Sequence, residues 1–302
     1  TADLFVLALL ASSTFGLIWS YLQFNNISGW DNLFLVLFAV SNIVLFGGGN
    51  IAQAVVEGLI NADFKPDNIF YIDRNTRNQK ALKKLKIKNL KKNASIKIDL
   101  FILAVKPKDA IEAYKQILNE YKDPKIVSFV AGIKSKKYIK LNQDIQFLRA
   151  MPNTSARFNL GITAIYNSSF SKNNLAKVSK LFKKIGIVMN LDNESKIDIF
   201  TGMIGSGPAY FFYLLKSYEK KLMSLCNQDK KKVNAAMVNL IKGVGFSIEN
   251  NDNLDELIDA VASKKGTTEA GLKSFKSEKL DKIFEKGISA AIKRSKEISN
   301  EF

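Results

Sequence analysis

Residues 42–60 read NIVLFGGGNIAQAVVEGLI, and this stretch decides the fold. A short apolar run comes first and predicts a buried strand. Glycines occupy positions 47–49, and the apolar side chains that follow recur at Ile51, Val55 and Leu59, on one face of a helix. A strand, a glycine turn and a helix in this order are typical of dinucleotide-binding folds, in which the backbone of the turn approaches a pyrophosphate at the helix N-terminus.

The residues after this stretch agree with that interpretation. A second apolar run at residues 69–72 ends in Asp73, which lies 24 residues after Gly49, near the position where an acidic residue meets the adenosine ribose in such folds. Arg74 and Arg77 favour a 2′-phosphate instead, because guanidinium groups pair well with phosphate. These residues therefore leave NAD and NADP both open.

Strand-like and helix-like segments alternate up to about Asp192, which predicts an α/β fold with a mostly parallel, doubly wound sheet. Further strands are expected at residues 100–105, 126–130, 145–148, 161–166 and 185–189. Beyond Asp192 the expected segments are helical, roughly at residues 194–226, 229–250, 253–263, 267–275 and 278–300. We therefore expect a Rossmann-like dinucleotide-binding domain over residues 41–192 and an all-helical domain over residues 193–302. By fold-level analogy, the helical domain would provide the dimer interface.

Composition excludes several kinds of site. The 302 residues contain no histidine, which rules out Ser-His-Asp triads, histidine acid–base catalysis and histidine-bound zinc. Cys226 is the single cysteine, so no internal disulfide and no thiolate metal site are expected, and a reducing compartment such as the cytoplasm is favoured. The formal charge of +17 comes from lysines spread along the chain without interleaved aromatics, so we interpret it as a solvated surface rather than a nucleic-acid site.

Residues 1–40 form a separate apolar extension in this interpretation. Residues 4–24 carry no charged side chain and are long enough to span a bilayer as a helix. Three alternatives stay open: a membrane anchor, a buried accessory helix, and an upstream segment foreign to the folded part. The first residue is threonine, which suggests a fragment or a processed start. We expect a cytoplasmic protein whose fold begins near Ser41, with membrane contact only if residues 4–24 are an anchor.

Short motifs occur in a fixed order after residue 41. They are GGGNIA at 47–52, AVKP at 104–107, AGI at 131–133, RAMPN at 149–153, GSGPAY at 205–210 and GTTEAGL at 266–272, with Arg294-Ser295 as a further match. Each string alone is compatible with a plain turn or strand end. In this combination the chain resembles pyrroline-5-carboxylate reductase over about 260 residues, from Ser41 to the end.

The resemblance implies an NAD(P)H-dependent oxidoreductase that reduces 1-pyrroline-5-carboxylate to L-proline, the last step of proline biosynthesis, as a homodimer or larger homo-oligomer. NADP is the expected cofactor and NAD is the alternative. The residues implied to bind the cofactor are Gly47, Gly48, Gly49, Asn50, Ile51, Ala52, Arg74, Asn75, Asn93, Ala104, Val105, Lys106, Pro107, Met151, Pro152 and Asn153. Those implied to bind the substrate, from the partner's helices, are Ser263, Gly266, Thr267 and Thr268, and those implied to act in catalysis are Thr268 and Ser206.

The residue types suit this chemistry. A Gly-Thr-Thr turn at a helix start offers N–H groups and hydroxyls to a carboxylate, and the Thr268 hydroxyl can accept a hydrogen bond from the ring N–H. Gly205 and Gly207 have no side chains, so the nicotinamide and the imine carbon could approach each other beside their helix. The cofactor carries the hydride, and a protonated imine needs no strong protein acid, so the lack of histidine is compatible with the reaction.

One turn departs from the family pattern. The family usually has Ser-Pro-Gly-Gly before the two threonines, whereas this chain has Ser263-Lys264-Lys265-Gly266, which puts substrate identity and turnover in question. Two rival functions stay open: a reductase for a related imine or a β-hydroxyacid, and a dinucleotide-binding protein without turnover. A β-hydroxyacid dehydrogenase would need a catalytic lysine on a helix, and Lys216 is present without the surrounding motif.

Overall fold

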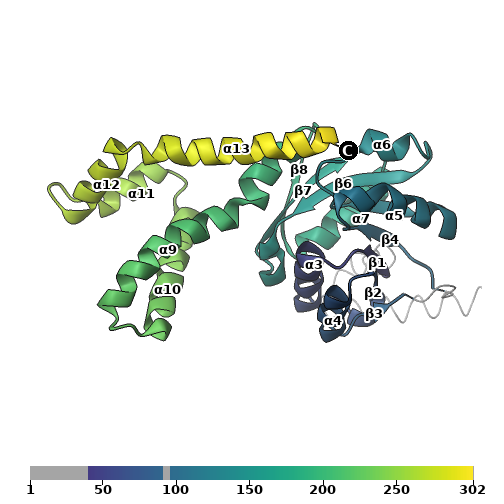
Figure 1. Cartoon of the computed structure of the whole chain (residues 1–302), viewed down its shortest axis with the longest axis horizontal. Helices are drawn as coiled ribbons and strands as arrows, with labels where there is room; N and C mark the ends of the chain where they lie inside the picture. The colour runs from purple at the N-terminus through teal and green to yellow at the C-terminus, as the bar shows by residue number, and fades with distance from the viewer. Residues whose placement is uncertain (1–39, 91–95, 302) are drawn as a thin grey trace, which may run out of the picture.

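The computed structural model describes residues 40–90 and 96–301, and a single sheet organises the first part of the chain (Figure 1). Among these residues the sheet has eight strands, in the order β3-β2-β1-β4-β5-β6-β7-β8. Their bounds are β1 Ile43–Phe46, β2 Ile69–Ile72, β3 Lys88–Asn89, β4 Leu100–Leu103, β5 Lys125–Ser128, β6 Gln146–Pro152, β7 Gly161–Asn167 and β8 Gly186–Asn190.

The strand order contains one reversal of direction. All neighbouring strands are parallel except β6 and β7, which are antiparallel. The chain adds β2 and β3 on one side of β1 and then crosses to β4 on the other side. The strand order therefore reverses at the carboxyl end of β1, and ligands of open α/β sheets bind at such points.

The strands expected from the sequence are present, with shifts at their ends. β4 stops at Leu103, short of residue 105, because the chain turns away after the Ala104 N–H donates to the Phe46 carbonyl oxygen over 2.7 Å. β6 continues to Pro152, beyond residue 148, because it pairs with β7 as well as with β5. The sequence did not predict β3, a polar edge strand of two residues.

Helices cover both faces of the sheet. They are α3 Asn50–Asn61, α4 Thr76–Lys84, α5 Pro107–Glu120, α6 Ser135–Ile139 and α7 Lys172–Lys183, with 3-10 turns at Pro66–Asn68 and Thr154–Phe158. Within β1, Ile43 and Leu45 belong to the core formed with α3 and α7, whereas Val44 and Phe46 belong to the core formed with α5 and α6. Both faces are thus buried, which explains why the strands read as continuous apolar runs.

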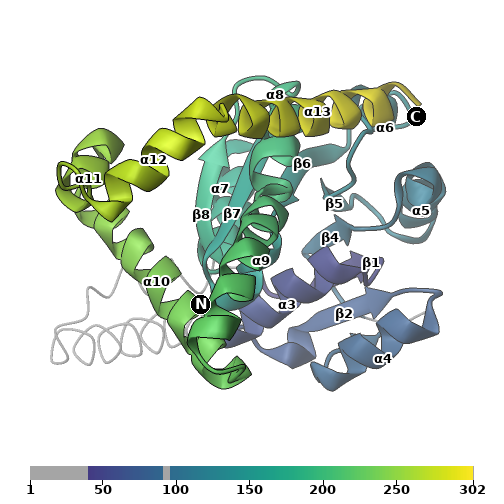
Figure 2. The ribbon, with the colours of Figure 1, turned by 60° about the vertical axis from the view of Figure 1, so that its left-hand side comes forward.

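The described chain after β8 is helical and extends away from the sheet. Its elements are α8 Lys196–Phe200, a π-helical turn η3 Thr201–Gly205, α9 Gly207–Leu225, α10 Lys230–Asn250, α11 Leu254–Val261, α12 Thr267–Ser277 and α13 Leu280–Glu301. Figures 1 and 2 show α9 and α10 leading outward, α11 and α12 at the far end, and α13 running back to the sheet. We call this part, from α9 to α13, the helical arm.

The structure corrects the continuous helix expected over residues 194–226. The π-helical turn η3 interrupts it, and α9 starts afresh with Pro208 in its first turn. At Gly202, in η3, a Cβ would lie 2.6 Å from the side chain of Ile292 on α13. α13 therefore packs closely against the chain at the point where the helix has π geometry instead of α geometry.

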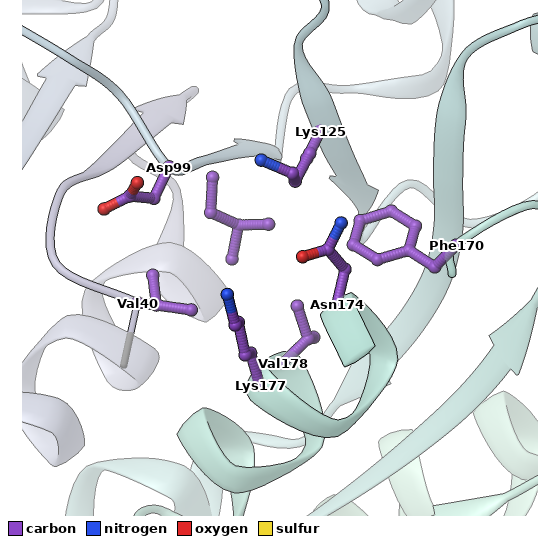
Figure 3. Close-up of a pocket in the computed structure, with 8 residues that line it drawn as sticks. Val40, Asp99, Lys125, Phe170, Asn174, Lys177 and Val178 are labelled. Atoms are coloured by element: carbon purple, nitrogen blue, oxygen red, sulfur yellow. The ribbon is translucent and has the colours of Figure 1, made fainter. Parts of the chain in front are cut away.

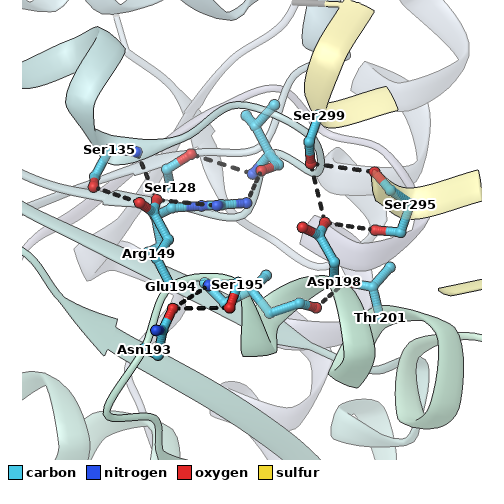
Figure 4. A network of polar contacts seen from close by, with 12 residues as sticks. Ser128, Ser135, Arg149, Asn193, Glu194, Ser195, Asp198, Thr201, Ser295 and Ser299 are labelled. Carbon is cyan, nitrogen blue, oxygen red and sulfur yellow. Dashed lines mark hydrogen bonds and ion pairs between the residues drawn. The ribbon is translucent and has the colours of Figure 1, made fainter. Parts of the chain in front are cut away.

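Buried polar contacts hold the returning α13 against the sheet (Figure 4). Asp198 of α8 is 5% exposed, and its Oδ1 accepts hydrogen bonds from the hydroxyls of Ser295 and Ser299 at 2.8 and 3.0 Å. Beside this group, Arg149 of β6 is 2% exposed and pairs with Glu194 over 3.1 Å. The two serine hydrogen bonds join α13 to α8 and give Ser295, part of a recognised motif, a structural role.

The start of the described chain is tied to the sheet. Val40 packs partly buried against the core, and the N–H groups of Ser41 and Asn42 both donate to Asp99 Oδ2, at 2.9 and 3.1 Å. The membrane span considered for residues 4–24 lies outside the described residues. Within the described ranges, no helix has the length and apolar character needed to cross a bilayer.

Candidate functional site

The glycine turn after β1 requires glycine at its first position. Gly47 has a φ of +99°, and an ideal Cβ there would lie 2.6 Å from the carbonyl oxygen of Ala104. Its N–H donates to the carbonyl oxygen of Ile72 over 2.9 Å. The turn is therefore held between the ends of β2 and β4, with no room for a side chain.

Asp73, which was expected near the adenosine ribose, holds the glycine turn. Its Oδ2 accepts hydrogen bonds from the Gly48 N–H over 2.5 Å and from the Asn78 side-chain amide over 2.9 Å. Its Oδ1 accepts the Asn75 N–H over 2.6 Å. Both carboxylate oxygens are thus engaged with the protein, a role that the sequence reasoning missed.

The helix after the turn presents its N-terminus to open space. Gly49 is the N-cap residue of α3, and none of the described side chains caps this end or, beyond the neighbouring residues, comes within 4 Å of the Cβ position of Gly49. Asn50 is exposed, Ile51 is half-buried, and Ala52 is buried against the sheet. The first-turn N–H groups, which have no partner within the helix, and the positive end of the helix dipole fit a pyrophosphate.

The end of β2 carries the residues expected near the adenosine. The Asn75 side chain caps α4 by accepting two N–H groups of its first turn, at 2.9 and 3.2 Å. Arg74 is 79% exposed and forms an ion pair of 3.0 Å with Asp109, a partner that the sequence did not reveal. Asn93, expected near the adenine, lies outside the described residues.

The residues expected beside the nicotinamide lie along the same edge. They are Ala104, Val105, Lys106 and Pro107 after β4, and Met151, Pro152 and Asn153 at the end of β6. Asn153 is 6% exposed, and its N–H and Oδ1 pair with the carbonyl oxygen and N–H of Ile162 at 3.2 and 3.0 Å. Because the strands from β1 through β4 and β5 to β6 are parallel, these residues and the glycine turn share the carboxyl edge of the sheet.

The residues expected to bind substrate lie at the start of α12. Gly266 is the N-cap residue, its N–H donates to the Ser263 carbonyl oxygen over 3.0 Å, and Thr267 and Thr268 begin the helix. Figures 1 and 2 both show α12 at the far end of the helical arm from β1 and β4. One chain therefore does not bring these residues to its own glycine turn.

Glu269 stabilises the turn before α12. Its carboxylate accepts the Lys265 N–H and pairs with Lys273 over 2.9 Å. The hydrogen bond from Lys273, and then that from the Lys265 amide, hold the pKa of Glu269 below its usual value of 4.5. Lys265 has a φ of +60°, in the left-handed region that favours glycine. The chain thus keeps a glycine-like turn with lysine in that position.

Ser206 lies at the other end of the helical arm, between η3 and α9. Its hydroxyl and its N–H both donate to the Thr201 carbonyl oxygen, at 3.2 and 3.0 Å. Gly205 is part of the π-helical turn, and apart from adjoining backbone no described atom lies within 4 Å of the Cβ position of Gly207. Gly207 is itself buried, so Ser206 lies next to a buried backbone segment without a side chain, and far from Thr268 of the same chain.

A small cavity of about 40 Å³ lies at the opposite edge of the sheet (Figure 3). Asp99 and Leu100 at the start of β4 and Lys125 at the start of β5 contribute to its lining. These are the amino ends of the strands, whereas the candidate site follows their carboxyl ends. The cavity is too small for a dinucleotide and is not part of the site.

Known proteins share both parts of the chain. Residues 42–132 match the family model described as NADP oxidoreductase, coenzyme F420-dependent, and residues 194–298 match the model described as pyrroline-5-carboxylate reductase dimerisation. Pyrroline-5-carboxylate reductase 1 of Bacillus spizizenii is 32% identical over 281 residues, which cover 88% of this chain and 92% of that protein. The chain belongs to the pyrroline-5-carboxylate reductase family.

Solved structures of reductases with this name have the same fold. The Coxiella burnetii protein is 27% identical with a TM-score of 0.72, and the match covers 86% of this chain and 99% of that chain. The Plasmodium falciparum protein, solved with NADP bound, is 22% identical with a TM-score of 0.76, over 85% of this chain and 98% of that chain. The family inferred from the motifs and the α/β fold class with its helical second part are confirmed.

The sequence reasoning gave no role to two carboxylates, one beside a motif and one within a motif. Asp109 lies two positions after Pro107, and Glu269 lies inside the GTTEAGL string, directly after Thr268. Carboxylates are common in the first turn of helices, where they interact favourably with the positive end of the helix dipole, so neither residue stood out. Their position in or near the motifs was the only signal in the sequence.

Proposed function

We propose that this chain reduces 1-pyrroline-5-carboxylate to L-proline with a hydride from NAD(P)H. Membership of the family supports this activity. The structural observation that supports this activity most directly is the turn after β1. Gly47 leaves no room for a side chain there, α3 follows without a side-chain cap, and the strand order reverses at this point. That arrangement suits a dinucleotide pyrophosphate, and residues 42–132, which contain it, match a model described as an NADP oxidoreductase.

The two ends of the cofactor are assigned to two regions of the carboxyl edge. We assign the pyrophosphate to the N–H groups at the start of α3 and the adenosine ribose to Arg74 and Asn75. Because an arginine suits a 2′-phosphate, NADPH is the proposed preference, with NADH also accepted. The nicotinamide is assigned to the space between the AVKP string after β4 and Met151, Pro152 and Asn153 after β6.

The proposed roles of the threonines follow from the substrate's chemistry. The substrate is a small ring with a carboxylate and an imine nitrogen. The N–H groups at the start of α12, with the hydroxyl of Thr267 and the Ser263–Gly266 turn, would bind the carboxylate. The Thr268 hydroxyl would accept a hydrogen bond from the protonated ring nitrogen, which orients the imine carbon.

When bound, NAD(P)H would supply the hydride that the imine carbon accepts. The electron pair of the C=N bond then becomes the lone pair of the ring nitrogen, so the iminium becomes a neutral secondary amine. This step needs no proton from the protein, in agreement with the absence of histidine from the sequence. Ser206, next to Gly207, which has no side chain, is the second hydroxyl that we assign to the reacting end of the site.

The separation of the two halves of the site supports a homodimer. Apolar side chains are exposed along the helical arm, namely Phe211, Phe212, Tyr213, Leu214, Tyr218, Val238, Leu240, Ile241, Val244, Phe246 and Ile248. An extended exposed apolar surface marks a site of interaction with another surface. In the proposed dimer, the partner's α12 approaches the glycine turn of this chain, and the matched model described as dimerisation spans the arm.

The domain assignment follows the same proposal. Residues 41–192 form the cofactor domain, and residues 193–302 form the dimerisation and substrate domain. Residues 1–40 have no part in catalysis in this assignment, although Val40 packs against the core. The single cysteine suits a reducing compartment, so we propose the cytoplasm as the location.

The test is oxidation of NADPH in the presence of 1-pyrroline-5-carboxylate, followed by absorbance. Thr268→Ala removes one hydrogen bond to a charged group, so kcat/KM should fall by roughly ten- to a hundredfold. NADPH affinity should stay the same because Thr268 is not among the residues assigned to the cofactor. Thr267→Ala is the matched variant, and its effect should be smaller because its neighbouring N–H groups still bind the carboxylate.

Two outcomes separate the alternatives. A wild-type chain that binds NADPH without turning over this substrate would be a dinucleotide-binding protein, or a reductase if a related imine or a β-hydroxyacid is turned over instead. A Thr268→Ala variant with normal kinetics would show that the substrate site is assigned to the wrong helix.

A further inference from the structure

An ion pair crosses the edge of the sheet at which we propose the cofactor to bind. Arg74 follows β2 closely, and Asp109 is the third residue of α5, which begins after β4. β2 and β4 are the two neighbours of β1, and adjacent strands lie about 4.8 Å apart, so the two loops are separated by roughly 10 Å. The 3.0 Å contact from Arg74 Nη2 to Asp109 Oδ1 therefore joins the loops on either side of the glycine turn.

This ion pair is one that a ligand can displace. The Arg74 side chain is 79% exposed and that of Asp109 is 29% exposed. An exposed ion pair shifts an equilibrium by a factor of at most about five. A guanidinium group binds phosphate through two parallel charge-assisted hydrogen bonds, which is the stronger interaction. A 2′-phosphate can therefore take Arg74 from Asp109, but only by breaking the existing contact.

Asp109, and not Asp73, is the carboxylate that competes for this arginine. The sequence suggested that Asp73 would oppose a 2′-phosphate. Both oxygens of Asp73 accept hydrogen bonds from the glycine turn and the start of α4, which directs the carboxylate to the protein. Asp109 instead cancels the positive charge of Arg74 that would attract an anionic ligand.

We infer that Asp109 is a specificity-determining residue that weakens the preference of this chain for NADPH over NADH. NADPH must separate Arg74 from Asp109, whereas NADH has no 2′-phosphate and leaves the pair intact. The inference rests on the proposed function for its class of ligand. It adds a residue outside the recognised motifs and a direct competition for Arg74.

The experiment measures the binding of NADP⁺ and NAD⁺ to the full chain by calorimetry, without substrate. Asp109→Asn should tighten NADP⁺ binding by about three- to fivefold and change NAD⁺ binding by less than about twofold. In an Arg74→Ala background the same substitution should give no gain, because there is no guanidinium group to release. Glu112→Gln removes the same charge from an exposed position one turn further along α5, and it should leave both affinities within about twofold.

Melting curves and a second variant, Asp109→Ala, guard against a folding defect in Asp109→Asn. Unchanged NADP⁺ affinity, an equal gain for both nucleotides, or a gain that persists without Arg74 overturns the inference. Binding requires no turnover, so the proposed reaction is tested separately. A chain that shows the Asp109 effect but does not oxidise NADPH with 1-pyrroline-5-carboxylate would refute the proposed reaction and leave the role of Asp109 standing.

Discussion

Removal of the two hydroxyls that bind Asp198 should weaken the attachment of α13 to α8. The Asp198 carboxylate is 5% exposed, and Ser295 and Ser299 donate to the same oxygen at 2.8 and 3.0 Å. A hydrogen bond to a charged group contributes about 1.5–3 kcal/mol, so either Ser→Ala change should cost roughly that amount. The double change leaves a buried carboxylate without these donors and should cost about 3–5 kcal/mol. With about 2–4 °C of melting temperature per kcal/mol, the double variant should melt roughly 6–20 °C lower.

The assay is thermal unfolding followed by circular dichroism, combined with steady-state kinetics. Ser247→Ala is the matched control, because Ser247 also donates its hydroxyl on a helix, to Gly243 over 3.0 Å, but at an exposed position. Since α13 connects the sheet to α12, the double variant should also raise KM for the substrate while NADPH affinity stays constant. A double variant that melts within about 2 °C of the wild type would refute the assigned role of these hydrogen bonds.

Three further changes test the two turns. Gly47→Ala should cost roughly 2–5 kcal/mol and weaken NADP⁺ binding, because its Cβ would meet the Ala104 carbonyl at a φ of +99°; unaltered binding would contradict this account. Lys265→Gly should raise the melting temperature by about 1–3 °C, since relief of left-handed strain outweighs the added freedom of the unfolded chain, and a lower value would argue against strain there. The pKa of Glu269 is lowered in the folded chain. The stabilisation of the turn by the ionised carboxylate is therefore complete above pH 4.5 and is lost as the pH falls below that value. Glu269→Gln should therefore have a higher substrate KM than the wild type at pH 7, and the two KM values should converge in acid, where the wild-type carboxylate is protonated. A difference in KM that persists in acid would show that the charge of the Glu269 carboxylate does not stabilise the turn.

The sheet could be predicted because burial on both faces leaves a plain pattern in the sequence. Strands such as Ile69–Ile72 are continuous apolar runs between polar segments, and the structure places this one at the predicted bounds. The glycine turn could be predicted equally well, because a positive φ and a close backbone contact at Gly47 allow only glycine. The two-residue strand β3 lacks any such pattern and was missed.

Contacts between segments distant in the chain could not be predicted in this way. Arg74 and Asp109 are 35 residues apart, and Asp198 and Ser295 are 97 residues apart. Which partner a carboxylate finds depends on how the helices pack, and the residue type alone carries no such information. Lys265 shows the converse case, in which the residue type argued against a left-handed turn that the surrounding contacts nevertheless impose.

The distance between α12 and the glycine turn within one chain has a genetic consequence in the proposed dimer. Each catalytic centre takes its threonines from one subunit and its pyrophosphate turn from the other. If one allele is defective at Gly47 and the other at Thr268, their products can assemble into a mixed pair. One centre of that pair then carries both lesions, while the other carries neither. Two inactive alleles would thus restore growth without proline when expressed together, whereas two alleles altered at the same turn would not complement each other.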